Sequence, residues 1–224
     1  MSKVLVTGGS GFLGTYVIHQ LLQSGHSVRT TIRDLAKESS IRQTLARAGS
    51  RPEEKLTCVR ADLASDEGWD AAVSDCDFVQ HVASPFPATV PRNENDLIIP
   101  AREGTLRVLR AAKSSGVKRV VLTSSFAAIG YGHGHRSEPL TEDDWSNENA
   151  RLSPYVKSKL LAEKAAWDFA AQSGLDLSVV NPVFILGPVL SSDLSSSVLL
   201  IKNMIDGNLK KVPKISFGIV DVRD

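Results

Sequence analysis

The chain has 224 residues, of which 42% are apolar and 23% charged, and its formal net charge is +1 at pH 7. This length allows one globular domain with a large core, or one domain and the start of a second. The near-zero charge argues against a nucleic-acid partner. No apolar run approaches the ~20 residues that a membrane helix needs, so we expect no membrane partner.

The two cysteines, Cys58 and Cys76, lie in or beside short apolar runs. We interpret them as reduced core residues rather than a disulfide framework. After Met1 the chain passes directly to the apolar run Val4–Val6, which is too short for the core of a secretory signal. These features predict a cytoplasmic protein.

Short apolar strands alternate with longer helical patterns along the chain. Apolar residues four apart, Leu13, Val17 and Leu21, indicate the first helix, and Gly25 marks its end. In chain order the predicted elements are strand Val4–Thr7, helix Phe12–Gln23, strand Val28–Ile32, helix Leu35–Ala48, strand Leu56–Arg60, strand Phe78–Val82, helix Asp96–Ser115, strand Val117–Thr123, helix Ser153–Ser173, strand Leu175–Val180 and helix Val198–Ile205.

This alternation predicts an α/β fold, a doubly wound parallel sheet covered by helices on both sides. We expect a dinucleotide-binding domain over residues 1–180 and the beginning of a smaller, incomplete substrate-binding domain over 181–224. The stretch Ser84–Pro100 holds four prolines and is predicted to be a loop. Ligands bind outside the carboxyl ends of the strands in such sheets.

A glycine-rich turn follows the first strand, with four glycines in seven residues. Glycine allows a sharp turn, a close approach of backbone to a pyrophosphate and tight helix–strand packing, while the helix N-terminus attracts the phosphates. An ordinary strand–helix turn is the alternative, but it rarely needs so many glycines. The predicted dinucleotide contacts are Gly8, Gly9, Ser10, Gly11, Phe12, Leu13 and Gly14.

The end of the second strand indicates which dinucleotide binds. Arg33 stands where an NAD site usually has an acid, with Lys37 beyond it, and a cation at the Arg33 position suits the 2′-phosphate of NADP. The alternative is that Arg33 faces solvent and Asp34 recognises the ribose. Asp62 and Leu63, after the third strand, are candidate adenine contacts, although Asp62 could instead be an N-cap for the adjoining segment.

Tyr155 and Lys159 lie four residues apart on one predicted helix, and therefore on one face. A neighbouring ammonium and the nicotinamide ring would favour the phenolate and lower the pKa of Tyr155. Ser125, at the end of the fifth strand, is a candidate to hold a carbonyl oxygen, and Ser124 is the weaker candidate because it points to the other face. A helix with an unrelated tyrosine and lysine is the alternative.

The loop Gly130–Ser137 contains His133 and His135. Because no carboxylate or cysteine stands at a fitting spacing, we interpret it as a flexible loop and expect no metal.

At these residues the chain resembles the extended short-chain dehydrogenase/reductase superfamily, which includes NAD-dependent epimerases and dehydratases, and within it the dihydroflavonol reductase and aldehyde/ketone reductase group. The matching stretches are VLVTGGSGFLG (Val4–Gly14), TIRD (Thr31–Asp34), HVASP (His81–Pro85), REGTLRVLRAA (Arg102–Ala112), VKRVVLTSS (Val117–Ser125), YVKSK (Tyr155–Lys159), NPVFILGP (Asn181–Pro188) and FGIVDVRD (Phe217–Asp224).

The resemblance implies a Rossmann-like fold and a Ser125–Tyr155–Lys159 set, in which Tyr155 gives a proton to a carbonyl whose carbon receives hydride from NADPH. It implies that Arg33 and Lys37 bind the 2′-phosphate. It also places five residues beside the ribose and nicotinamide: Val82, Ala83, Ser84, Pro182 and Val183.

Three departures from the family pattern bear on the substrate. Gly130 stands where plant dihydroflavonol reductases have Asn, which argues against a flavonoid. RLSPYVKSK replaces the NWYCYGK-type stretch of cinnamoyl-CoA reductases, which argues against that activity. Relatives continue past the VDVRD motif, so we expect this chain to be a fragment. Specificity is expected from 85–91, 130–136 and 191–197.

The sequence thus predicts an NADP-dependent oxidoreductase that reduces a small aldehyde or ketone. The alternatives are a nucleotide-sugar epimerase or dehydratase, which returns its hydride, and a non-catalytic NADP(H) sensor, which usually lacks the tyrosine. Both a monomer and a homodimer are compatible with the sequence.

Overall fold

The computed structural model describes residues 1–86, 91–191, 194–209, 211, 214 and 216–224. Six parallel strands form the main sheet: β1 (Lys3–Thr7), β2 (Ser27–Ile32), β3 (Leu56–Arg60), β4 (Phe78–His81), β5 (Arg119–Thr123) and β6 (Leu177–Val180). The helices are α1 (Phe12–Gln23), α2 (Glu38–Arg47), α3 (Pro52–Lys55), α4 (Trp69–Val73), α5 (Asn95–Ser114), α6 (Pro154–Ser173) and α7 (Ser196–Ile205), with 3₁₀ turns η1 (Leu35–Lys37) and η2 (Phe126–Ala128).

The sheet has the strand order β3-β2-β1-β4-β5-β6, and every neighbouring pair is parallel. The predicted doubly wound, Rossmann-like fold is therefore confirmed. The chain winds outward in one direction from β1 and in the other from β4, so a crevice opens between these two strands at their carboxyl ends. Thr7 and His81 face each other there in register.

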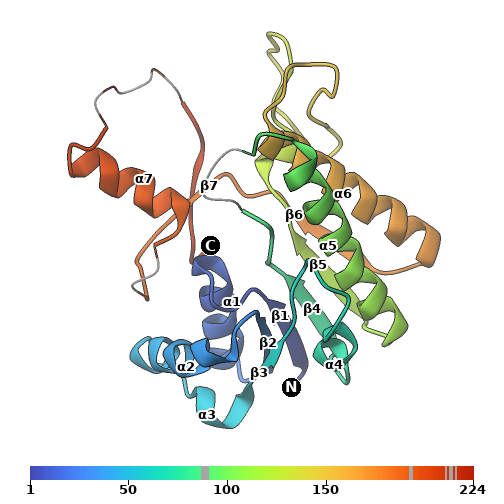
Figure 1. Ribbon diagram of the computed structural model, residues 1–224, viewed down its shortest axis with the longest axis vertical. Coiled ribbons are helices and arrows are strands. Elements are labelled where there is room, and N and C mark those ends of the chain that lie inside the picture. The colour runs from blue at the N-terminus through green and yellow to red at the C-terminus, as the bar shows by residue number, and fades with distance from the viewer. Residues whose placement is uncertain (87–90, 192–193, 210, 212–213, 215) are drawn as a thin grey trace.

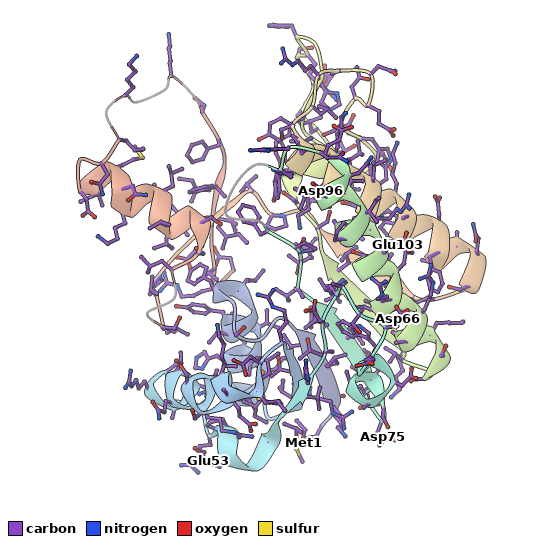
Figure 2. The ribbon with its side chains drawn as sticks, in the orientation of Figure 1. Met1, Glu53, Asp66, Asp75, Asp96 and Glu103 are labelled. Carbon is purple, nitrogen blue, oxygen red and sulfur yellow. The ribbon has the colours of Figure 1, made fainter. Side chains whose placement is uncertain are left out.

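Helices cover both faces of the sheet (Figure 1), and an apolar core lies on each face. Successive strand residues point to opposite faces, so Leu5 packs in one core and Val6 in the other. Ile18 of α1 and Leu45 of α2 belong to the core with Val6, whereas α4, α5 and α6 complete the core with Leu5. Side chains fill these layers, and exposed carboxylates such as Glu53, Asp66 and Asp75 project at the periphery (Figure 2).

Several element boundaries differ from the sequence-based predictions. Val117 closes the end of α5 by donating its N–H to the Ala112 carbonyl at 3.0 Å, so β5 begins only at Arg119. The predicted helix Leu35–Ala48 is divided into η1 and α2, and the predicted strands ending at Val82 and beginning at Leu175 are shorter. The predicted proline-rich loop ends earlier, because residues from Asn95 onward are helical and α5 continues through Pro100.

The segment after residue 180 holds β7 (Phe184–Leu186), α7 and β8 (Ile219–Asp221), and β7 pairs with β8 in a separate two-stranded sheet. The hydroxyl of Tyr16 on α1 donates to the Pro188 carbonyl at 2.8 Å, which ties this segment to the main domain. The C-terminus lies beside α1 (Figure 1). A domain boundary at residue 180 stays a prediction. Within the described ranges, no helix combines the length and apolar character needed to span a bilayer.

Candidate active site

A cleft of about 1400 Å³ opens at the carboxyl ends of the central strands. It brings together most of the residues that the sequence singled out: Gly8, Ser10, Gly11, Phe12, Leu13, Gly14, Arg33, Asp62, Leu63, Val82, Ala83, Ser84, Ser125, Tyr155, Lys159, Pro182 and Val183. Gly9 and Lys37 lie outside its lining. Residues 87–90 and 192–193, within two predicted specificity regions, lie outside the described residues.

The glycine turn leaves the start of α1 open toward the cleft. Gly8 has φ +74°, a left-handed conformation that favours glycine, and a Cβ at Gly14 would lie 2.3 Å from the Gly8 carbonyl oxygen. A Cβ at Gly9 would lie 2.0 Å from Thr30 Oγ1, so Gly9 allows the turn to pack against β2. The helix N-cap is Gly11, which has no side chain to occupy the first N–H groups, and these groups suit a phosphate.

Arg33 rather than Asp34 faces the cleft. The carboxylate of Asp34 accepts a hydrogen bond from the Ala36 N–H at 3.0 Å and caps η1, so it is occupied by its own backbone. Arg33 is exposed and makes no hydrogen bond or ion pair with the residues that the structure describes. The guanidinium is therefore available to an anionic ligand. Lys37 is exposed within η1.

Asp62 caps the turn that follows β3 and also lines the cleft. Its Oδ1 accepts from the Ala64 N–H at 3.0 Å, which fixes the turn after β3. Asp62 and Leu63 nonetheless line the cleft, on the β3 side of the glycine turn.

Thr7 and His81 join β1 and β4 beneath the cleft, and both side chains are fully buried. Thr7 Oγ1 accepts the N–H groups of Val82 (3.0 Å) and Ala83 (2.9 Å), so its own proton goes to His81 Nδ1 at 2.8 Å. Burial lowers the pKa of His81 to about 3, with the charge of Lys159 acting in the same direction. The imidazole is thus neutral, and this bond fixes where the chain leaves β4 toward Ser84.

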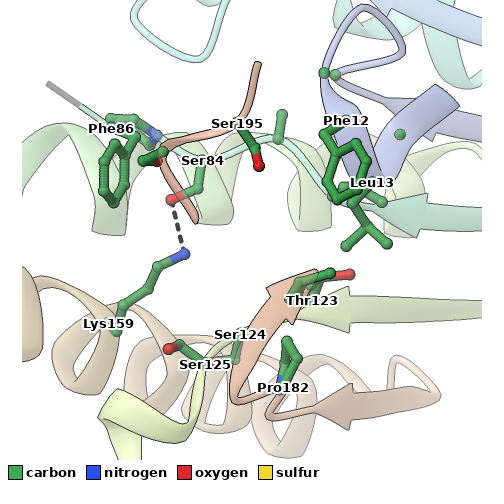
Figure 3. Close-up of a pocket in the computed structure, with 18 of the residues that line it drawn as sticks. Phe12, Leu13, Ser84, Phe86, Thr123, Ser124, Ser125, Lys159, Pro182 and Ser195 are labelled. Carbon is green, nitrogen blue, oxygen red and sulfur yellow. Dashed lines mark hydrogen bonds between the residues drawn. The ribbon is translucent and has the colours of Figure 1, made fainter. Parts of the chain in front are cut away.

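The candidate catalytic side chains meet at the start of α6. Ser153 accepts from the Val156 N–H at 3.3 Å and Pro154 occupies the first helical position, which starts the helix where the sequence predicts. The Tyr155 hydroxyl donates to Ser125 Oγ at 3.4 Å. Lys159 Nζ donates to Ser84 Oγ at 2.9 Å (Figure 3). The same Nζ lies 5.9 Å from the Tyr155 ring centroid.

Burial is the largest influence on the pKa values of Tyr155 and Lys159. It raises the pKa of Tyr155, with the Ser125 hydrogen bond opposing and Tyr131 adding to this effect. Burial also lowers the pKa of Lys159 to about 8, with Glu163 opposing. The chain alone therefore does not lower the pKa of the Tyr155 phenol as the sequence led us to expect, because desolvation outweighs the hydrogen bond with Ser125. The phenol is protonated and able to donate a proton.

Aromatic side chains that the sequence analysis did not single out form a wall near Tyr155. The Phe86 ring meets the Tyr155 ring edge-on at 5.4 Å, and Tyr131 packs against Phe126 at 6.1 Å. Phe184 and Phe217 line the cleft with ring centroids 4.8 Å apart. The Phe86–Tyr155 and Phe184–Phe217 contacts join segments far apart in the chain, so no local sequence pattern could have indicated them.

The histidine loop shows no metal-binding arrangement. His133 Nε2 lies 2.7 Å from the Ile129 carbonyl oxygen, and His135 is exposed. Across the described ranges, no three His, Cys, Asp or Glu side chains gather in a way that could hold a metal ion.

The fold and the cleft define a Rossmann-like dinucleotide-binding domain of the short-chain dehydrogenase/reductase type. Residues 4–219 match the NAD dependent epimerase/dehydratase family, and the chain belongs to that family.

Several similar proteins are reductases. The chain is 37% identical to a cinnamoyl-CoA reductase of Medicago truncatula, over 99% of this chain and 69% of that protein. It is 36% identical to a dihydroflavonol 4-reductase of Hordeum vulgare, over 92% of this chain and 59% of that protein. The crystal structure of yeast methylglyoxal/isovaleraldehyde reductase Gre2 complexed with NADPH superposes with a TM-score of 0.85 at 28% identity, over 99% of this chain and 71% of that one.

Proposed function

We propose that the chain is the cofactor-binding part of an NADPH-dependent reductase that converts a small aldehyde or ketone to an alcohol. The observation that carries the proposal is the meeting of Tyr155, Ser125 and Lys159 in a cleft that begins at the glycine turn. The reductase names of its relatives and the NADPH bound to the yeast structure support it.

The residues present fit NADPH. The open N-terminus of α1 suits the pyrophosphate, and the uncompensated guanidinium of Arg33 suits the 2′-phosphate. Asp62 and Leu63 would border the adenine. Five residues would border the ribose and nicotinamide: Val82, Ala83, Ser84, Pro182 and Val183. When bound, the nicotinamide supplies the hydride that reduces the carbonyl carbon.

Tyr155 is the proton donor to the carbonyl oxygen in this proposal. Its raised pKa keeps the phenol protonated until the developing alkoxide takes the proton. Ser125 Oγ, 3.4 Å from the Tyr155 hydroxyl, orients the same oxygen. The Lys159 ammonium stabilises the phenolate that remains after proton transfer.

A Tyr155→Phe variant tests this assignment, because it removes the proton and keeps the ring against Phe86. We expect turnover of a panel of aldehydes and ketones, followed by NADPH absorbance, to fall at least about a hundredfold, while NADPH affinity stays similar. Tyr16→Phe is the matched control, since Tyr16 lies on α1 and bonds the Pro188 carbonyl. Undiminished turnover by Tyr155→Phe would refute the proposal.

A nucleotide-sugar epimerase or dehydratase is the second candidate, because the matching family includes such enzymes. An enzyme of that kind returns the hydride to its substrate and keeps its cofactor bound. The exposed Arg33, which suits the extra phosphate of NADP, favours the reductase. The presence of Tyr155 argues against the third possibility, a non-catalytic NADP(H) sensor. Nucleotide retained through purification would favour the epimerase instead.

We place the protein in the cytoplasm, because Cys58 and Cys76 are both free thiols, as expected in a reducing compartment. The sequence allows a monomer or a homodimer, which light scattering distinguishes.

A further inference from the structure

A buried carboxylate lies one helical turn beyond Lys159 on α6. Glu163 is only 4% exposed, and a carboxylate removed from water is stable only with partners. Its Oε2 accepts from Asn181 Nδ2 at 2.6 Å, and its Oε1 accepts from Trp167 Nε1 at 3.4 Å. No catalytic step proposed above uses this group.

Asn181 connects Glu163 to the candidate catalytic serine. The same Nδ2 that donates to Glu163 donates its second proton to the Ser125 carbonyl oxygen at 3.1 Å. Asn181 follows the end of β6, and Ser125 follows the end of β5. The carboxylate therefore fixes the separation between α6, which carries Tyr155, and the backbone that carries the Ser125 hydroxyl.

Glu163 is also the only negative side chain among the described residues that face Lys159. From α6 the ammonium faces Tyr155 and Glu163, and from β4 it faces His81, whose pKa of about 3 keeps it neutral. The loop after β4 contributes Ser84, and the buried residues of α5 are all uncharged. Asp96 and Glu103 also lie on α5 (Figure 2), but they are not among its buried residues, and Glu103 forms an ion pair with Arg102 at 3.0 Å.

We propose that Glu163 is a positioning residue of the candidate active site: its carboxylate holds Asn181 against the Ser125 carbonyl and supplies the negative charge that keeps the Lys159 ammonium protonated. The inference rests on the proposed function, because positioning Ser125 and Lys159 affects activity only if these two residues act on a substrate. The four-residue spacing on the helix places Glu163 beside Lys159, and the burial of Glu163 reduces the screening of its charge by solvent.

The test is the titration of Lys159 in the free protein, which needs neither substrate nor NADPH. Protein labelled with ¹³C at lysine Cε is titrated by NMR, and Lys159→Met identifies the resonance. We expect Glu163→Gln to lower the midpoint of Lys159 by about one pH unit. Trp167→Phe is the control, because it removes one hydrogen bond to Glu163 and leaves the charge in place, so the midpoint should stay.

An unchanged Lys159 midpoint in Glu163→Gln would overturn the proposal. If that variant fails to fold, Glu163→Asp serves instead, because it withdraws the carboxylate by one methylene and should lower the midpoint by a smaller amount.

Asn181→Ala tests the link to Ser125: we expect kcat to fall about tenfold at similar KM, with the Lys159 midpoint unchanged. Full kcat in Asn181→Ala would disprove that link. Because the NMR titration is independent of turnover, its failure is distinguishable from failure of the reductase proposal.

Discussion

Replacing Lys159 with methionine should stabilise the free protein, because the ammonium is held in an unfavourable, partly buried site. Burial lowers the pKa of Lys159 from 10.5 to about 8. At about 1.4 kcal/mol per pKa unit, this difference corresponds to a penalty of about 3 kcal/mol in the folded state. Methionine removes that penalty and also the hydrogen bond from Lys159 to Ser84, which is worth about 1 kcal/mol. The net expectation is a gain of about 2 kcal/mol at pH 7.

The pH dependence identifies the cause of this gain. Between pH 8 and 10.5 the unfolded chain keeps the Lys159 proton while the folded chain releases it, so wild-type stability rises with pH across this window. The advantage of Lys159→Met is therefore complete below pH 8 and vanishes above about pH 10.5. Urea unfolding followed by tryptophan fluorescence at pH 7 and pH 10 measures both effects.

Lys157→Met is the matched control, because the same substitution two residues away removes an ion pair with Glu94 at 2.8 Å. Partly exposed pairs of this kind contribute about 0–1 kcal/mol, so this variant should be slightly less stable than the wild type. The reasoning is refuted if Lys159→Met is less stable than the wild type at pH 7, or if its advantage is the same at both pH values. Loss of turnover in the more stable Lys159→Met variant would show that Lys159 is needed for activity although it lowers the stability of the folded protein.

Three further predictions concern the nucleotide cleft. Arg33→Ala should weaken NADPH binding about 10- to 100-fold and leave NADH binding unchanged, because only NADPH carries the 2′-phosphate. Calorimetry with both nucleotides measures this, and an equal loss for both would contradict the assignment. Lys37→Ala should have the smaller effect, because Lys37 lies outside the cleft lining. Thr7→Val should lower the free energy of unfolding, measured in urea, by about 2–4 kcal/mol, because it leaves two buried N–H groups and an imidazole nitrogen without a partner. Thr7→Ser keeps the hydroxyl and should be nearly neutral. Equal stability of the two variants would show that these hydrogen bonds do not stabilise the fold. Gly14→Ala should reduce NADPH affinity at least about tenfold, because the new Cβ would lie 2.3 Å from the Gly8 carbonyl oxygen, and wild-type affinity in a fluorescence titration would show that the turn tolerates a side chain.

The main sheet was predictable because its signals are local. Strands β1 and β5 hold short apolar runs, Val4–Val6 and Val120–Leu122, and α1 carries a clear four-residue apolar spacing. Elements too short to show a period were missed, among them α4, with five residues, and β7 and β8, with three each. Their existence depends on tertiary contacts, such as the pairing of Phe184 with Ile219.

The candidate site was predictable where spacing and chemistry coincide, as at Tyr155 and Lys159. The aromatic contact of Phe86 was not predictable, because it depends on the path of the chain after β4. Glu163 could have been noticed, since it continues the four-residue series of Tyr155 and Lys159. Its burial and its bond to Asn181 could not be known, because a glutamate on a helix surface usually points to solvent.

The complete burial of His81 bears on how pH–rate profiles of this protein are to be assigned. When an enzyme loses activity between pH 5 and 7, histidine is ordinarily the first suspect. His81 would be uncharged throughout that interval, since it gains a proton only in strong acid. It therefore adds no positive charge beneath a bound nucleotide as the medium is acidified, and any inflection near neutrality must be sought in other groups.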